Sequence, residues 1–217
     1  MSSKKTVLLI SLGKPHIFDE QYHELLSALK AHTSYTEVTL STDVASALSK
    51  KPNGVLITNP NFARVQHSAL HEKIVSYVKS GGTVIYCGLY PGIIAPALLE
   101  KHFETVWGLP WKVGSYNRTM FFLAQQRPAL LQHKADLAEE LEIKAVRIKG
   151  ANPMDFVYTT TPDSRVEELG KAEVAHKPDE AAVVFTSIGS GHMGYIGDVE
   201  AENETTDIVM AMLGLPA

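Results

Sequence analysis

A regular alternation of short β-branched runs with helical patterns in the first half of the chain constrains its fold more than any other feature. Residues 55–58 and 83–87 read as buried strands, and residues 66–79 between them repeat apolar side chains at helical spacing. Strands joined by helices pair in parallel, because the helix returns the chain to the same end of the sheet. Near the end of the chain, runs 181–188 and 192–199 flank a glycine-rich turn and predict an antiparallel hairpin. The sequence therefore predicts an α/β fold with a doubly wound, mainly parallel sheet and a C-terminal antiparallel hairpin.

The pattern is less regular between the two regions. We expect a helix over residues 129–141 and a polar loop with little secondary structure over residues 162–179. A chain of 217 residues is long enough for one well-buried core and short for two. We therefore expect a single domain over residues 1–217.

Charge and composition restrict the partners. The formal net charge is -4, and no concentration of Lys and Arg is present, so we expect neither nucleic acid nor an anionic membrane surface as a partner. The apolar stretch at residues 6–10 is too short for a signal peptide or a membrane span. A single cysteine allows no intramolecular disulfide, which suits a reducing compartment, and we expect a cytoplasmic protein.

The chain contains a strand, a helix and a second strand in succession, the strands at 53–57 (NGVLI) and 82–87 (GTVIYC). The second strand ends in the only cysteine. This order resembles the class I glutamine amidotransferase-like superfamily, and residues 191–199 resemble a late strand of its trehalose-utilisation-type branch. Residues 18–20, 111–119 and 194–202 are most similar to a poorly characterised fungal family, some of whose members are labelled triacylglycerol lipase-like. The resemblance implies a flavodoxin-like sheet with Cys87 at the nucleophile's position.

The motifs around that position depart from those of an active amidotransferase. The enzyme needs a Gly-x-Cys-x-Gly turn and a His followed two residues later by Glu, so that the base activates the thiol. Here the turn at Cys87 reads IYCGL, and the place of the His and Glu reads GDV at residues 197–199. The Gly-x-Ser-x-Gly turn of lipases is also missing from the sequence. We therefore expect no glutaminase activity.

Open parallel sheets bind ligands outside the carboxyl ends of their strands, and three candidate catalytic residues lie in segments expected there. Cys87 follows a strand, near backbone N–H groups that favour a thiolate, although a small buried hydrophobe is the alternative. Asp198 and Glu202 stand at the opposite lip and could act as general acid or base if burial raises a pKa. Alternatively, Asp198 caps the last helix.

An aromatic segment forms the second candidate region. Trp107, Trp111 and Tyr116 alternate with glycine and proline and are followed by Arg118, which suggests a rigid apolar wall with one cation. Such a wall suits a mostly apolar ligand with an anionic or carbonyl group, and a dimer contact or a satellite core is the alternative. The predicted ligand-binding residues are His16, Tyr90, Trp107, Trp111, Tyr116 and Arg118.

Two further patterns are weaker. His67 and His71 lie four residues apart on a helix and could share a metal, but they border an apolar stripe, so a packing role is favoured. Residues 189–194 (GSGHMG) spell a dinucleotide fingerprint, but a strand follows instead of the helix that would hold the pyrophosphate. We predict no metal and no cofactor.

These observations predict a degenerate amidotransferase-like domain that binds a small, mostly apolar organic molecule. It could transform that molecule without a cofactor, as an isomerase, cyclase or lyase, and the fungal resemblance implies secondary metabolism. A non-catalytic binding or assembly module is the alternative, with the aromatic segment as the interface of a homodimer. A weaker alternative is a hydrolase that uses Cys87.

Overall fold

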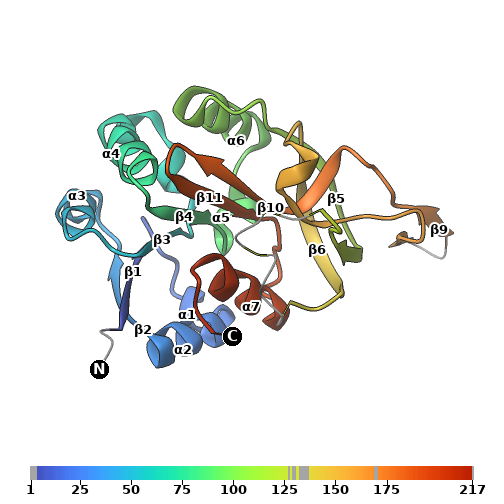
Figure 1. Ribbon diagram of the computed structural model, residues 1–217, viewed down its shortest axis with the longest axis horizontal. Coiled ribbons are helices and arrows are strands. Elements are labelled where there is room, and N and C mark those ends of the chain that lie inside the picture. Colours follow the sequence, from blue (N-terminus) through green and yellow to red (C-terminus); the bar gives the residue numbers. More distant parts are fainter. Residues whose placement is uncertain (1–3, 127, 129–130, 132–136, 169–170, 217) are drawn as a thin grey trace.

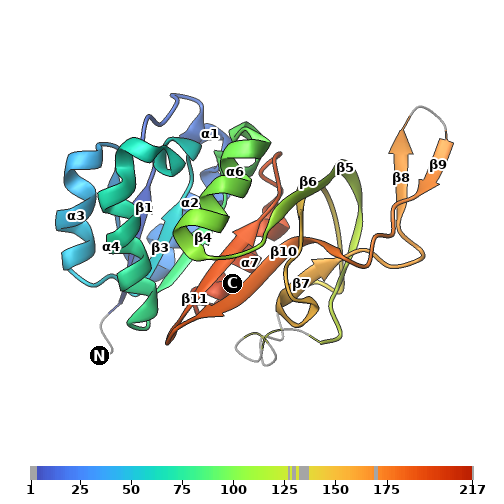
Figure 2. The same cartoon turned by 90° about the horizontal axis from the view of Figure 1, so that it is seen from above.

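The computed structural model describes residues 4–126, 128, 131, 137–168 and 171–216, which form one continuous sheet flanked by helices (Figures 1 and 2). The strands are β1 (Lys5–Ile10), β2 (Thr33–Val38), β3 (Gly54–Ile57), β4 (Thr83–Tyr86), β5 (Lys112–Leu123), β6 (Glu140–Lys149), β7 (Phe156–Thr159), β8 (Arg165–Glu168), β9 (Lys171–Val174), β10 (Glu180–Ile188) and β11 (Gly191–Ile196). The helices are α1 (Phe18–Gln21), α2 (His23–His32), α3 (Ser41–Ser49), α4 (Ser68–Lys79), α5 (Leu89–Ile93), α6 (Pro96–His102) and α7 (Asn203–Met212). Short 3-10 turns are η1 (Pro60–Ala63), η2 (Val65–His67) and η5 (Pro153–Asp155), and η3 (Phe103–Trp107) is a π-helical turn.

The sheet is mixed, and antiparallel pairs outnumber parallel ones. Its order is β2-β1-β3-β4-β11-β10-β6-β5-β8-β9, and β7 pairs with both β10 and β5. Only the pairings among the first five strands in this order are parallel, so four of the eleven pairings are parallel and seven are antiparallel. Strands β5, β6, β10 and β7 pair in a closed ring, which makes a small barrel. The prediction of a flavodoxin-like, mainly parallel sheet is therefore wrong.

The barrel is missed from the sequence because its closure depends on pairings between distant segments, and the periodicity of a single strand does not reveal them. Along most of β6, buried positions alternate with exposed or half-buried ones, as in an antiparallel strand with one solvent-facing side. One of the buried positions is the charged residue Arg147, which a sequence pattern would place on the surface. The expected polar loop at 162–179 contains β8 and β9, which pair with each other at the sheet edge. The helix expected over residues 129–141 lies mostly outside the described residues, and its last two residues belong to β6.

Helices cover both faces of the parallel part of the sheet. Figure 1 shows α3, α4 and α6 on one face and α1, α2 and α7 on the other. Each set closes its own hydrophobic cluster, because successive side chains of a strand point to opposite faces. In β3, for example, Leu56 packs toward α2 and α7, whereas Val55 and Ile57 pack toward α3 and α4. No helix among the described residues is long and apolar enough to cross a membrane.

A buried ion pair joins three strands inside the barrel. The Nη1 atom of Arg147 on β6 lies 3.6 Å from the Oε2 atom of Glu180 on β10 and donates to the Ala175 carbonyl at 2.9 Å. Its Nη2 atom donates to the Oδ1 atom of Asn117 on β5 at 2.7 Å, and the Glu180 carboxylate accepts from the backbone N–H of Ser115 at 3.0 Å. Each charge is thus compensated inside the protein, as buried charges must be.

We expect the substitution Glu180→Gln to lower the free energy of unfolding by about 3 kcal/mol, because it leaves the guanidinium of Arg147 buried without its counter-charge. Urea denaturation of wild type and variant measures this change. The control is Glu142→Gln on the exposed side of β6, where we expect a change below about 0.5 kcal/mol. Equal stability of the two variants would contradict a structural role for the pair.

Candidate functional site

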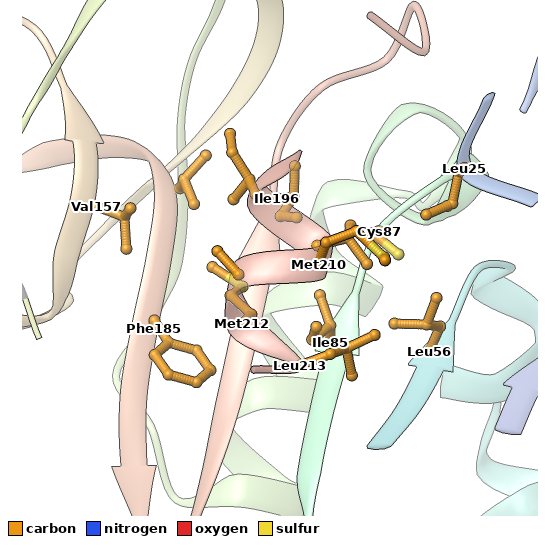
Figure 3. Packing of buried hydrophobic residues seen from close by; sticks show 14 of the residues in the cluster. Leu25, Leu56, Ile85, Cys87, Val157, Phe185, Ile196, Met210, Met212 and Leu213 are labelled. Atoms are coloured by element: carbon orange, nitrogen blue, oxygen red, sulfur yellow. The ribbon is translucent and has the colours of Figure 1, made fainter. Parts of the chain in front are cut away.

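The carboxyl ends of the parallel strands, where we expect a ligand site, are filled by the protein itself. Cys87 follows β4, is 2% exposed, and donates its backbone N–H to the Ile57 carbonyl at 3.1 Å. Figure 3 shows its side chain among those of Leu25 and Met210, which come from α2 and α7. The cavity that Cys87 borders has a volume of about 20 Å³. That is room for one water molecule and not for an organic ligand.

Gly88, and not Cys87, occupies the strained position of the strand-to-helix turn. Its backbone has φ 65° and ψ -133°, and it precedes α5 directly. In enzymes with a nucleophile on such a turn, the strained residue is the nucleophile itself, which lifts its side chain out of the sheet. A Cβ atom on Gly88 would stand 3.2 Å from Cβ of Thr58, so this turn is packed against the neighbouring loop.

The surroundings of the Cys87 thiol keep it protonated. Burial raises its pKa to about 12. Since the thiolate is the nucleophile, a thiol with this pKa is unreactive at neutral pH. The geometry therefore matches the buried-hydrophobe alternative for Cys87 and gives no support to an activated thiol.

Asp198 organises the loop that leads into α7. Its Oδ1 atom accepts from the N–H of Glu200 at 2.9 Å, and its Oδ2 atom accepts from the N–H of Glu202 at 2.9 Å and the hydroxyl of Thr205 at 3.0 Å. Burial raises the pKa of Asp198, while these three hydrogen bonds act in the opposite direction. Asp198 therefore holds the loop before α7 in place, whereas the N-cap residue of α7 is Glu202, which makes no side-chain capping bond.

Arg118 is brought close to Glu202, but the two neutralise each other. The Nη2 atom of Arg118 donates to the carboxylates of Glu200 and Glu202, and Lys144 lies 3.6 Å from Glu200. Tyr116, two residues before Arg118 on β5, is 54% exposed and has the Lys144 ammonium 5.4 Å from its ring centroid. The predicted cation of a binding wall is thus one member of a surface ion-pair network.

The two tryptophans are part of the core. Trp107 and Trp111 are 8% and 2% exposed, and the ring centroid of Trp111 lies 5.0 Å from that of Phe103. Tyr90 is fully buried beside Tyr86, with ring centroids 4.8 Å apart, whereas His16 is exposed on a loop. The satellite-core alternative therefore describes the tryptophans, and within the described ranges of the chain these residues form no aromatic wall beside a pocket.

A groove of about 800 Å³ lies elsewhere, between the η1–α4 segment and the α6–η3 segment. In Figure 1, α4 and α6 lie next to each other on the same face of the sheet. The apolar lining residues are Ala63, Val65, Val75, Leu98 and Val106, and the polar ones are Arg64, Gln66, Ser68, His71, Glu72, Lys101, His102 and Thr105. None of these belongs to the sets predicted as catalytic or ligand-binding.

A hydrogen-bond chain fixes the tautomer of His102, one of the two buried histidines that line the groove. Trp107 Nε1 lies 2.9 Å from the hydroxyl of Tyr86, which lies 2.8 Å from Nε2 of His102. An indole N–H can only donate, so the hydroxyl accepts from Trp107. Among the described residues, Nε2 of His102 is the one acceptor within hydrogen-bond distance of the hydroxyl, so the hydroxyl donates its hydrogen to Nε2. Burial lowers the pKa of His102 to about 3, so the ring is neutral at pH 7 and carries its hydrogen on Nδ1. This Nδ1–H is buried and has no hydrogen-bond partner among the described residues.

His71 presents the complementary tautomer. Its Nε2 atom lies 2.6 Å from the Phe62 carbonyl, which can only accept, so Nε2 carries the hydrogen and Nδ1 carries a lone pair. Burial lowers the pKa of His71, although the bond to Phe62 acts in the opposite direction. The rings of His71 and His102 meet edge to face with centroids 5.0 Å apart. Two neutral imidazoles of opposite tautomer therefore lie side by side, with the Nδ1–H of His102 buried beneath the lining of the groove.

His71 is the one groove residue that sequence reasoning singled out, as part of a spacing that fits a metal site. The described residues contain no group of three His, Cys, Asp or Glu side chains that could hold a metal ion. His71 is instead buried against Phe62, which agrees with the favoured packing role. The sequence gives no indication that His102 belongs to a site, because a single histidine at a helix end fits many roles.

Comparison with known proteins gives a likeness of fold. No family model matches the chain, and no curated protein matches it. A β-galactosidase from Bacillus circulans sp. alkalophilus is similar with a TM-score of 0.60 and 14% identity, over 99% of this chain and 32% of that one. A ThuA-like protein from Parabacteroides merdae has a TM-score of 0.56 and 10% identity, over 100% of this chain and 92% of that one. An exo-β-1,4-mannosidase from an Opitutaceae bacterium has a TM-score of 0.51 and 13% identity, over 96% and 34%.

What is shared is the fold alone. The chain spans about a third of the length of the two glycosidases. The assignment to the class I glutamine amidotransferase-like superfamily and to a fungal lipase-like family is wrong, because no family model matches and the neighbours named above are glycosidases and a ThuA-like protein. The residues behind that assignment describe a strand-helix-strand order, which many α/β proteins share.

We expect Cys87 to resist alkylation in the folded protein. Because its thiol is buried and its pKa is raised to about 12, iodoacetamide at pH 8 should react roughly 100-fold more slowly than with the urea-unfolded chain. Intact-mass spectrometry over time measures both rates. Rapid alkylation of the native protein would restore the hydrolase hypothesis.

We expect acid to destabilise the protein through His102. Between about pH 6.5 and pH 3 the unfolded chain protonates this histidine and the folded chain does not, so stability is lost as the pH falls through that window. In His102→Gln, the slope of unfolding free energy against pH between pH 4 and 6 should decrease by about 1.4 kcal/mol per pH unit. Denaturation curves at several pH values measure the slope. The exposed variant His32→Gln is the control and should keep the wild-type slope.

Proposed function

We propose that the protein binds a small, largely apolar organic molecule in the groove between α4 and α6. The observation that carries this proposal is the combination of a volume of about 800 Å³ with apolar walls, and the unpartnered Nδ1–H of His102 lies buried beneath this lining. Ligand pockets are commonly of this size and combine apolar walls with a few convergent polar groups. The crevice at the strand ends, at about 20 Å³, cannot take this role.

Apolar contact supplies most of the expected affinity. Val65 at the groove is 84% exposed, and Val75, Leu98 and Val106 are half-buried, so a ligand would cover apolar surface that now faces water. An aromatic body buries roughly 150 Å², which is worth about 4 kcal/mol at 25 cal/mol/Å². From apolar contact alone, a ligand of this size is therefore expected to bind with a Kd of roughly 1 mM.

The two histidines would orient the ligand. A buried donor without a partner costs free energy. The Nδ1–H of His102 lies beneath the lining, so a ligand oxygen would reach it only after the lining side chains move, and it would then gain a hydrogen bond that the free protein lacks. The lone pair on Nδ1 of His71 can accept a ligand hydroxyl or N–H. A ligand with a carbonyl and a neighbouring donor fits this pair.

Chemical transformation of the ligand without a cofactor stays a prediction. The group best suited to it is His71, a neutral imidazole with one free lone pair that could take a proton from a bound ligand. For the assembly-module alternative, Trp107 and Trp111 are buried but Tyr116 of the same aromatic segment is exposed, so this alternative and homodimer formation stay predictions. A cytoplasmic location remains our proposal, supported by the lone unpaired cysteine.

We expect the uncharged fluorescent amine N-phenyl-1-naphthylamine to bind saturably and Leu98→Trp to weaken this binding at least about ten-fold, because the indole fills the groove. Ser68→Trp, at an exposed lining position, blocks the groove without touching the core. Fluorescence titration measures binding, and circular dichroism confirms that each variant is folded.

Ala97→Trp is the matched control. It adds the same side chain at the exposed neighbouring position of α6, which does not line the groove, and should leave the affinity unchanged. Absence of saturable binding, or equal binding by wild type and both groove variants, would contradict the proposal.

A further inference from the structure

We propose that the ligand of this groove is an organic monoanion, an apolar body that carries one singly charged acidic group. This inference rests on the proposed binding function. It follows from the charges around the groove, the pairing of the neighbouring cations and the direction of α4.

The charged side chains that line the groove are Arg64, Lys101 and Glu72. The imidazoles of His71 and His102 are neutral at pH 7, because burial lowers the pKa of both. The lining therefore carries a net charge of about +1 on a chain whose formal net charge is -4. A positive groove on a negatively charged protein attracts small anions and disfavours cations.

Both cations are left available by their neighbours. Lys101 is flanked on the same segment by Glu100 and Glu104, but these carboxylates face Lys112, at 3.6 Å and 4.0 Å. Neither Lys101 nor Arg64 forms an ion pair with any residue in the described part of the chain. The positive charge of Arg64 is felt nearby, since it contributes, after burial, to the lowered pKa of His67.

The backbone of α4 adds to the same field. This helix has 12 residues, and Ser68, His71 and Glu72 from its first turns line the groove, so its N-terminal end faces the ligand space. The N-cap residue, His67, makes no side-chain capping bond, so its side chain does not satisfy the N–H groups of the first turn. A helix N-terminus favours a negative charge. The buried Nδ1–H of His102 is a further donor without a partner in the described structure, and an anionic oxygen is its strongest acceptor.

Glu72 opposes an anion, since it is the one acidic side chain that lines the groove. Its negative charge keeps the net charge of the lining at about +1. A ligand with two negative charges would carry more charge than the lining can neutralise. One negative charge on an apolar body is therefore the best match to both the walls and the lining charges.

Two probes with the same ring skeleton test this inference: the anion 8-anilino-1-naphthalenesulfonate and its uncharged analogue N-phenyl-1-naphthylamine. At pH 7 and low salt, we expect the wild type to bind the anion at least about ten-fold more tightly than the analogue, and added salt to reduce this preference. Arg64→Gln combined with Lys101→Gln should bring the preference to about two-fold or less while the affinity for the uncharged probe is unchanged. Glu72→Gln should increase the preference.

The control double variant, Lys30→Gln with Lys50→Gln, changes the net charge equally at exposed positions outside the groove and should keep the wild-type preference. An equal affinity of the wild type for both probes, or an equal loss in the control double variant, would overturn the anion inference alone. If the uncharged probe does not bind, or binds Leu98→Trp as well as wild type, the proposed binding function fails instead.

Discussion

The whole structure depends on one strand, β11, which bonds in parallel on one edge and antiparallel on the other. Residues 192–195 pair in parallel with β4, and residues 191–196 pair antiparallel with β10. Two glycines make these approaches possible. A Cβ atom on Gly194 would stand 2.7 Å from the sulfur of Met212 in α7, and one on Gly197, just after β11, would stand 2.2 Å from the Val146 carbonyl oxygen. Through this strand, the helical half and the barrel share a continuous core.

The helical half could be predicted from the sequence and the barrel could not. The runs at 55–58 and 83–87 become β3 and β4, and the C-terminal hairpin forms where the glycine-rich turn predicts it. These elements follow from local periodicity. The barrel depends on pairings between distant segments, such as β7 with both β5 and β10, and its interior holds the charges of Arg147 and Glu180. Local periodicity can indicate a single strand such as 181–188, but it carries no information on which distant strand lies beside it.

The candidate site was harder to predict than the fold, for a related reason. Arg118, Asp198 and Glu202 do come together, but they satisfy one another and the loop before α7. Trp107 and Trp111 have the composition of a binding wall and the burial of a core. Composition alone cannot separate these two cases, because large aromatic side chains suit both. The groove exists only because α4 and α6 lie next to each other, and no spacing within either segment indicates that.

The chain from Trp107 through Tyr86 to His102 has a direction that the tyrosine hydroxyl determines. The indole can only donate, and Nε2 of His102 is the one acceptor in the described part of the chain within reach of the hydroxyl hydrogen, so the last hydrogen lies on the imidazole nitrogen that the tyrosine does not contact. A phenylalanine in place of Tyr86 would remove this donor, and both tautomers of His102 would then be open to the ring. A residue that does not line the groove thus holds His102 in a single tautomer, so the hydrogen-bond character of the imidazole beneath the groove is set from inside the core.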